Sequence, residues 1–371
     1  MKLALVHDWI RDMSGAERVL VELHKIYPQA PIYTLFYDEK FTRQILPGAD
    51  IRASFLQKFP LVVKYYRLAA ALMPAAIESL DLSDFDIVLS SSVIFSKGLV
   101  LRPTTRHICY CYSPTRQIWD LNAKVQNTGS RAQYFGFWSL GFKNSVGKHL
   151  LRLWDRSAAE RPTEFVAISQ TVADRIKKYY RRDSRIVYPP VTINKSVPKP
   201  SSSNSRELEE EYYLIVSRLF PHKNVGIAIE AFNKIGYPLV IIGDGPERKK
   251  LQHMAGKNIT FLGGLDDVSV SAYYAACRAF IMPQEEDFGL TAVEAMSYGK
   301  PIIALRKGGA TETVVEGMTG EFFDDPIPEG LDDAVRRLNE NYPTYNSEII
   351  KSHAAKFSSN KFREAISKLV A

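Results

Sequence analysis

The stretch Glu285-Glu-Asp-Phe-Gly-Leu-Thr-Ala-Val-Glu294 predicts a connection from a strand to a helix. Met282 ends a buried apolar run, Gly289 permits a tight turn, and an amphipathic helical pattern follows it. The backbone N–H groups at such a helix start attract an anion, whereas the carboxylates of Glu286 and Glu294 can accept hydrogen bonds from hydroxyl groups. The two acids could instead only complement the helix dipole.

The same alternation of strand and helix extends outward in both directions. Toward and beyond this stretch, we expect strands at 212–217, 238–242, 259–262, 279–282 and 301–304, and helices at 225–235, 246–254, 268–276 and 290–298. In the first half, we expect strands at 3–6, 86–90, 106–111 and 164–168, and helices at 16–26 and 171–180. Strands separated by helices imply parallel sheets that are covered on both faces.

A break near residue 190 divides this series into two. The stretch Val187-Tyr-Pro-Pro-Val191 is stiff and extended, and the polar, Pro- and Ser-rich residues 195–205 suit a linker or surface loop. A length of 371 residues also exceeds one ordinary core. We expect an α/β protein with two doubly wound Rossmann-like domains, 1–190 and 191–358, whose strand ends face a cleft. A last helix within 359–371 would pack back on the first domain.

Composition excludes several classes of protein. The apolar content of 46% and the charged content of 24% are ordinary for a soluble globular protein. Cys109, Cys111 and Cys277 cannot form a disulfide framework, and the first two have the wrong spacing for a zinc knuckle. The N-terminal apolar run is too short for a signal peptide, and no stretch approaches the roughly 20 apolar residues that cross a bilayer. We therefore expect a cytoplasmic protein with reduced core thiols.

Positive charge is concentrated in the first half of the chain. Residues 1–190 carry 27 Lys and Arg against 17 Asp and Glu, whereas residues 191–371 carry 21 against 24. Segments 55–72 and 131–156 interleave cations with large apolar side chains, as in segments that lie in a lipid headgroup layer. Ordinary amphipathic core helices and a solvated basic face are the alternatives. Our hypothesis is a protein peripheral on the inner face of the cell membrane, with no nucleic-acid partner because no binding module is recognised.

The motifs together resemble one enzyme family. Glu286 and Glu294, seven residues apart with Phe-Gly-Leu-Thr between them, resemble the E-x(7)-E signature of the retaining GT-B glycosyltransferases in a large bacterial family. Further stretches continue the resemblance over essentially the whole chain: S-G-A-E-R-V-L (14–20), V-S-R-L-F-P-H-K-N (216–224), I-G-D-G-P-E (242–247), G-K-P-I-I-A-L-R-K-G-G-A-T-E-T-V (299–314) and G-M-T-G (317–320).

The resemblance implies a set of site residues. Arg218 and Lys223 would hold the donor diphosphate and, with Glu286 on the transferred sugar, would be catalytic; otherwise the two are surface cations. The implied donor-binding residues are Gly15, Gly263, Leu265, Phe288, Gly289, Leu290, Thr291 and Glu294. Among these, Glu294 would bind the ribose, and Gly15 would let the first loop approach the donor.

The stretch Tyr110-Cys-Tyr-Ser-Pro-Thr-Arg-Gln-Ile-Trp-Asp120 resembles a Y-x-H-[ST]-P-x-R-Y-x-W-D segment of a mannosyltransferase-like subgroup. Tyr112 stands where that subgroup has a histidine against the donor sugar, and Gln117 stands where it has a tyrosine. A phenol still donates a hydrogen bond but is bulkier and not cationic at neutral pH, so the choice of sugar depends on this position. The implied acceptor or sugar pocket contains Asp8, Trp9, Tyr112 and Arg116.

The activity that the resemblance implies is transfer of a hexose with retention at the anomeric carbon. The subgroup favours mannose from GDP-mannose, and the acceptor would be lipid-linked or a saccharide in cell-surface polysaccharide synthesis. The first domain would bind the acceptor and the second the nucleotide sugar. An epimerase of the same fold and a non-catalytic nucleotide-sugar-binding module are the alternatives.

We expect no cofactor and no required metal, because the protein's cations take the place of a metal at the diphosphate. Asp84-Phe-Asp86 is formally D-x-D, but it leads straight into a predicted strand. The sequence contains no G-x-G-x-x-G after a strand, no P-loop and no G-x-S-x-G, which argues against a dehydrogenase, a P-loop kinase and a serine hydrolase.

Overall fold

The computed structural model describes residues 2–59, 61–119, 145–191 and 211–371. The chain divides into two compact units: unit 1 is residues 1–190 with 359–371, and unit 2 is residues 191–358. The expected linker at 195–205 and residues 131–144 of the second basic segment lie outside the described residues. Each unit is built on a parallel sheet, so the predicted fold class is confirmed.

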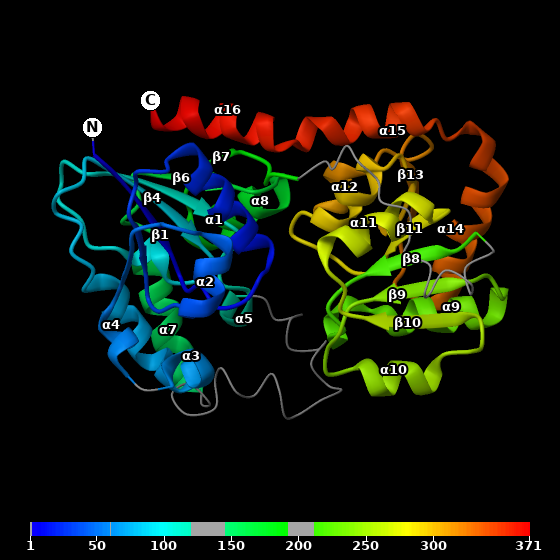
Figure 1. Cartoon of the computed structure of the whole chain (residues 1–371), viewed down its shortest axis with the longest axis horizontal. Coiled ribbons are helices and arrows are strands. Elements are labelled where there is room, and N and C mark those ends of the chain that lie inside the picture. Colours follow the sequence, from blue (N-terminus) through cyan, green and yellow to red (C-terminus); the bar gives the residue numbers. More distant parts are fainter. Residues whose placement is uncertain (1, 60, 120–144, 192–210) are drawn as a thin grey trace. The chain divides into compact units, whose positions relative to one another are not determined.

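Unit 1 contains, within the described residues, a seven-stranded sheet in the order β3-β2-β1-β4-β5-β6-β7 (Figure 1). All of its neighbouring strands pair in parallel. The strands are β1 (Leu3–His7), β2 (Ile32–Thr34), β3 (Ile51–Ala53), β4 (Ile87–Ser92), β5 (Arg106–Cys111), β6 (Glu164–Ala167) and β7 (Ser184–Ile186). We did not predict β2, β3 and β7, because three residues are too few to establish a period of two.

The α-helices of unit 1 are α1 (Gly15–Ile26), α2 (Glu39–Ile45), α3 (Val62–Tyr65), α4 (Met73–Glu78), α5 (Arg116–Trp119), α7 (Ser145–Ala158), α8 (Gln170–Tyr180) and α16 (Ser359–Val370). Short 3-10 helices are η1 (Phe55–Lys58), η2 (Tyr66–Leu72) and η3 (Ser96–Gly98). The C-terminal helix α16 returns to unit 1 and packs against α1. Arg363 contacts Glu22 of α1 at 2.7 Å, and Phe362 meets the Tyr110 ring edge-on at 5.7 Å.

Unit 2 contains, in the part of the chain that is described, a six-stranded parallel sheet in the order β10-β9-β8-β11-β12-β13 (Figure 1). Its strands are β8 (Tyr213–Val216), β9 (Leu239–Ile242), β10 (Ile259–Gly263), β11 (Ala279–Met282), β12 (Ile302–Leu305) and β13 (Gly320–Phe323). Its α-helices are α9 (Val225–Ile235), α10 (Arg248–Met254), α11 (Asp267–Ala276), α12 (Leu290–Ser297), α13 (Ala310–Thr313), α14 (Pro328–Asn341) and α15 (Ser347–Ala354), with 3-10 turns η6 (Pro221–Lys223), η7 (Tyr342–Thr344) and η8 (Ala355–Phe357). Fully buried Phe232, Ile241 and Leu338 represent its core.

The order of the strands reverses once in each sheet. In unit 1 the chain proceeds one way from β1 and the other way from β4; in unit 2 the same reversal separates β8 from β11. Open α/β sheets bind ligands outside the carboxyl ends of the strands at such a switch point. The residues that follow β1, β4, β8 and β11 are therefore the first place to look for a site.

Several smaller expectations are also resolved. The three cysteines are free and buried, which confirms the prediction of core thiols outside any disulfide, and burial raises the pKa of Cys109 and of Cys277 to about 12. Asp86 accepts a hydrogen bond from the Lys2 backbone N–H at 2.7 Å, and β4 begins at the next residue, which confirms the strand-entry interpretation. No described helix combines the length and the apolar character needed to span a membrane.

Candidate functional site

The switch point of unit 2 carries an ion pair. Lys223 lies in the turn that follows β8, and Glu286 lies in the loop that follows the neighbouring strand β11. The Lys223 Nζ donates to Glu286 Oε1, and Gln284 Nε2 donates to the same oxygen at 2.8 Å. Burial alone would raise the pKa of Glu286, but the charge of Lys223 and the two hydrogen bonds lower it below its ordinary value. Glu286 is therefore an ionised acceptor beside a cation.

Two glycines hold the Glu286 loop against the end of β12. The Glu286 carbonyl accepts a hydrogen bond from the Gly309 N–H at 2.8 Å, and Glu286 forms an isolated parallel bridge with Gly308. A Cβ at Gly308 would lie 2.2 Å from the Glu286 carbonyl oxygen, and one at Gly309 would lie 2.3 Å from the Phe288 Cα. Only glycine allows this approach. Gln284, Gly308 and Gly309 belong to the site, although the sequence analysis did not single them out.

Helix α12 begins immediately after this loop. Gly289 is its N-cap with φ +90°, and a Cβ there would lie 3.1 Å from the Met282 Sδ. The Gly289 carbonyl accepts hydrogen bonds from Ala292 and Val293, so the N–H groups of Leu290 and Thr291 precede the first intrahelical bonds. Those two N–H groups form the positive end of the helix dipole, as the predicted anion site requires.

The other predicted donor residues of unit 2 have different surroundings. Glu294 is half-buried, and Tyr274 OH donates to its Oε2 at 3.1 Å, a contact that the sequence analysis missed. Phe288 is buried against Phe357, with ring centroids 5.5 Å apart. Arg218 is exposed and lies over the Phe220 ring.

Gly263 and Leu265 lie farther along the carboxyl edge of the same sheet, at the end of β10 and just beyond it. Gly263 has φ +73°, and its carbonyl accepts a hydrogen bond from the Gly243 N–H at 2.7 Å. A Cβ there would lie 3.3 Å from the Arg248 guanidinium. Leu265 is half-buried. The two residues are thus separated from β8 by strand β9.

The switch point of unit 1 is organised by Asp8. Its side chain is fully buried, and its two carboxylate oxygens accept hydrogen bonds from the backbone N–H groups of residues 93–96, at 2.5 to 3.1 Å. We predicted Asp8 in an acceptor or sugar pocket, but the structure gives it another role, because four backbone donors occupy its oxygens. Asp8 holds the loop after β4 against the end of β1. Its neighbour Trp9 lies among the rings of Phe36, Tyr66 and Phe95.

A chain of hydrogen bonds starts at Tyr112. The Tyr112 OH donates to the Ala16 carbonyl at 3.1 Å and lies 2.8 Å from the Ser91 Oγ. The Ser91 Oγ lies 3.0 Å from the His7 Nδ1, and the His7 Nε2 lies 3.4 Å from the Glu17 Oε1. Tyr112 is therefore connected both to the start of α1 and, through Ser91 and His7, to Glu17.

The N-terminal glycine loop leads into this network. Ser14 caps α1, Gly15 is the first helical residue, and the Ser14 hydroxyl donates to Glu17. Burial acts to raise the pKa of Glu17, but hydrogen bonds from His7 and Ser14 outweigh it and lower the pKa. The sequence analysis missed Ser91, His7 and Glu17; the position of His7 at a strand end beside Asp8 was the available signal.

Arg116 begins the short helix α5, which a buried carboxylate holds on both sides. Asp155 accepts hydrogen bonds from Thr115 Oγ1 at 2.8 Å and from Trp119 Nε1 at 2.7 Å. Asp155 also pairs with the buried Lys97 at 2.7 Å. The helix that carries Arg116 is thus held in place by Asp155, Thr115 and Trp119, which were not predicted as site residues. Among the described residues, no group of three or more His, Cys, Asp or Glu side chains could hold a metal ion.

Comparison with known proteins gives this geometry a context. Residues 198–356 match the family model for glycosyl transferases group 1. Residues 198–356 are therefore similar to a group 1 glycosyltransferase domain. They include Lys223, Glu286 and the start of α12, so the polar groups at the switch point of unit 2 lie within the matched region.

Two curated relatives of the chain are named as transferases of sugars. An uncharacterized glycosyltransferase of Methanocaldococcus jannaschii is 27% identical over 60% of this chain and 62% of its own length. A GDP-mannose-dependent alpha-(1-6)-phosphatidylinositol monomannoside mannosyltransferase of Mycobacterium tuberculosis is 29% identical over 46% of this chain and 51% of its own length. The matches therefore span about half to three fifths of these two relatives' own lengths.

A solved structure shares the fold of the whole chain. HepE of Anabaena, solved in complex with UDP, matches with a TM-score of 0.73 over 100% of this chain and 99% of its own, at 18% identity. At this identity the likeness concerns the fold, which is that of the GT-B glycosyltransferases.

Proposed function

We propose that this chain is a retaining glycosyltransferase that takes a hexose from a nucleotide diphosphate donor. The observation that carries the proposal is the Lys223–Glu286 pair at the switch point of unit 2, next to the N-terminus of α12. This arrangement offers different groups to the diphosphate and to the sugar. A cation and backbone N–H groups suit a diphosphate, and a carboxylate that is ionised and acceptor-only suits sugar hydroxyls.

The same groups support a mechanism. The diphosphate gains negative charge as it leaves the sugar, and donors fixed in place before the reaction stabilise that charge without reorganisation. Lys223, Arg218 and the N–H groups of Leu290 and Thr291 are the donors we assign to it. Glu286 would bind the transferred sugar and Glu294 the ribose. The leaving phosphate would take the acceptor proton, so no protein base is assigned.

We favour GDP-mannose as the donor. The mycobacterial relative is named for dependence on GDP-mannose, and the 110–120 segment resembles a mannosyltransferase-like subgroup. HepE, in contrast, has been solved with UDP-glucose. Because position 112 carries Tyr where the subgroup has His, the donor panel also includes UDP-sugars.

We assign acceptor binding to unit 1 and donor binding to unit 2. The acceptor would be lipid-linked or a saccharide, in cell-surface polysaccharide synthesis, and a lipid-linked acceptor would place the protein on the inner face of the membrane. The name of the mycobacterial relative, which refers to a phosphatidylinositol mannoside, supports a lipid-linked acceptor. We propose that catalysis needs no metal, because we assign the charge of the diphosphate to Lys223 and Arg218.

The test is product analysis with a panel of nucleotide sugars and lipid-linked or oligosaccharide acceptors. Mass spectrometry should detect an acceptor enlarged by one hexose, and NMR should show the anomeric configuration of the donor retained. An altered nucleotide sugar formed without acceptor would instead identify an epimerase. Donor binding without any product across the panel would identify a non-catalytic module.

A further inference from the structure

The segment from Phe59 to Leu72 exposes a stripe of large apolar side chains. Leu61, Tyr65, Leu68 and Leu72 are 64, 48, 57 and 46% exposed, and Phe59 beside them is 51% exposed. Leu61 is the N-cap of α3, Tyr65 is its last residue, and Leu68 and Leu72 belong to the 3-10 helix η2. Val62 and Ala70 lie between these exposed residues and are buried.

Helix α7 repeats the arrangement. Val146, Leu150 and Leu153 are 61, 56 and 55% exposed and follow one helical face. Leu151 and Ala158 are buried on the other side of the helix. An amphipathic helix that covers a core normally turns polar residues outward, so an apolar outer face requires a partner.

The two stripes belong to one region of unit 1. Val62 of α3 and Leu151 of α7 contribute to the same buried cluster, and the Trp154 indole of α7 donates to Glu78 of α4 at 2.9 Å. Figure 1 shows α3, α4 and α7 together at one end of unit 1. We call the residues of the two stripes the apolar face.

The charge of this region is positive. Residues 55–72 contain no Asp or Glu, and residues 145–154 contain none either, whereas Lys58, Lys64, Lys148 and Arg152 lie between the apolar residues. Lys58 and Lys64 are exposed, and Lys64 lies over the Tyr65 ring, with its Nζ 5.3 Å from the ring centroid. Cations among exposed aromatic and aliphatic side chains match the interface of a bilayer that carries negative charge.

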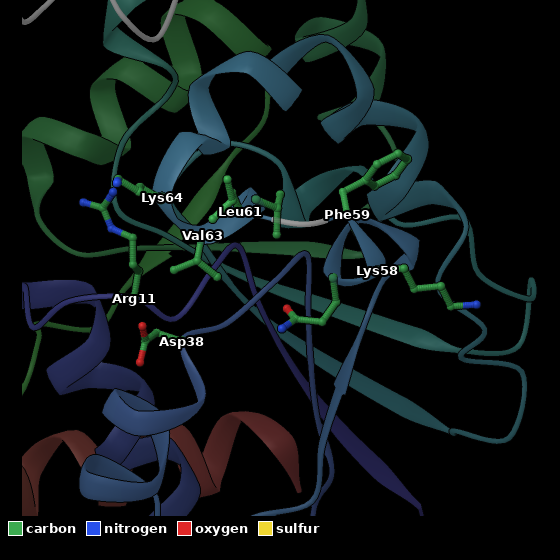
Figure 2. Close-up of a pocket in the computed structure, with 9 residues that line it drawn as sticks. Arg11, Asp38, Lys58, Phe59, Leu61, Val63 and Lys64 are labelled. Atoms are coloured by element: carbon green, nitrogen blue, oxygen red, sulfur yellow. The ribbon is translucent and has the colours of Figure 1, made fainter.

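A hollow of about 650 Å³ opens beside the first stripe. Figure 2 shows Arg11 and Asp38 at one side of it and Phe59 and Lys58 at the other, with Leu61 and Val63 between. Arg11 pairs with Asp12 at 2.9 Å, and Asp38 is occupied in part by capping α2 through the Phe41 N–H. Lys58 and Lys64 are the exposed cations of the lining. The lining thus combines cations with apolar side chains, as the phosphate and first carbons of a lipid require.

We propose that the apolar face docks on an anionic phospholipid bilayer, with a lipid phosphate in the Arg11–Lys58–Lys64 hollow. The proposal rests on the proposed function in one respect, because a lipid-linked acceptor requires the protein at a bilayer. The positive charge of the apolar face favours a bilayer over a second copy of this chain as the partner. A second copy of this chain would bring lysines against lysines, whereas anionic headgroups neutralise them.

Vesicle flotation tests the docking. The full chain should float with vesicles of phosphatidylcholine containing 30 mol% phosphatidylglycerol, and high salt should weaken the binding. The variant Leu68→Ser/Leu150→Ser should bind roughly tenfold more weakly, because it removes one apolar side chain from each stripe. Lys58→Ala/Lys64→Ala should lose about fivefold for each lysine and show a weaker salt dependence, since Lys148 and Arg152 remain.

The matched control is Val268→Ser/Ile349→Ser, which replaces apolar residues of unit 2 that are 60 and 48% exposed. It should bind vesicles like the unaltered chain. Equal loss in the control, or no flotation of the unaltered chain, would overturn the proposal. So would a dimer in sedimentation velocity that the Leu68→Ser/Leu150→Ser variant dissociates, since a second copy would then occupy the face.

Titration of the same variants with nucleotide sugars separates this proposal from the proposed function. Variants that lose vesicles and keep the nucleotide ligand support the docking face. A chain that binds nucleotides without floating overturns the docking alone, and a chain that floats without binding any nucleotide overturns the proposed function alone.

Discussion

At the scale of single residues, Lys223 and Glu286 have complementary roles. The sequence analysis predicted both from a resemblance, but it did not predict that they pair with each other or that Gln284 supports the carboxylate. Contacts of this kind join residues 63 positions apart, and their geometry depends on the neighbouring strands β8 and β11. Local periodicity carries no information about such a pair.

Replacement of Lys223 by Ala should lower turnover by roughly 100-fold or more, because one fixed donor to the leaving diphosphate is lost. Steady-state kinetics with the donor identified by product analysis would measure it. Lys249→Ala, an exposed lysine of α10, is the matched control and should retain normal turnover. Near-normal turnover of Lys223→Ala would refute the catalytic role.

Glu17 should contribute a pH-dependent part of the stability. Its folded pKa lies below the ordinary 4.5, so its contribution is fully present above about pH 4.5 and is lost as the pH falls through the folded pKa. The melting temperature of Glu17→Gln should therefore be lower than that of the unaltered chain at about pH 6, with the gap narrowing as the pH falls below about 4.5. The exposed Glu39→Gln is the control. A gap that does not change with pH would contradict the assigned hydrogen-bonded carboxylate.

At the scale of elements, the Asp8 carboxylate connects the end of β1 to the loop after β4, in addition to the hydrogen bonds between the two strands. The sequence indicated the long strands well, and the predicted bounds of β5, β11 and α9 agree with the structure. It did not indicate that Asp8 would bind the backbone of the loop at 93–96. An acid after a strand suits a ligand site and a loop clamp equally, and only the burial of the carboxylate separates the two.

The substitution Asp8→Asn should destabilise unit 1 by about 2–5 kcal/mol, because an amide nitrogen would face buried N–H donors that then lack an acceptor. Denaturant unfolding would measure the change. Asp50→Asn, which alters an exposed pair with Arg52, should cost less than about 1 kcal/mol. A comparable loss in both variants would show that the clamp contributes little.

At the scale of the whole molecule, the two-sheet α/β class could be predicted because its strands are mostly buried on both faces and are separated by helices. The order of strands in each sheet, and hence the two switch points, could not be predicted from periodicity. The exposure of the stripe from Leu61 to Leu72 could not be predicted either, because the same apolar sequence pattern is typical of a helix packed in a core and of a helix that docks on a surface.

Removal of divalent metal should leave the transfer rate unchanged, because we assign charge stabilisation to Lys223, Arg218 and the start of α12. Turnover measured after exhaustive chelation, with and without added magnesium, is the test. A strict requirement for added magnesium would show that a cation from solution carries the diphosphate charge and that the assigned donors are insufficient.

Calorimetric titration tests whether a nucleotide sugar binds at the Lys223–Glu286 pair. The unaltered chain and Lys223→Ala would be titrated with GDP, UDP and their sugars. We predict that at least one nucleoside diphosphate binds the unaltered chain and that Lys223→Ala binds it roughly tenfold more weakly or worse. Failure of every nucleotide to bind, or equal binding by Lys223→Ala, would contradict the site.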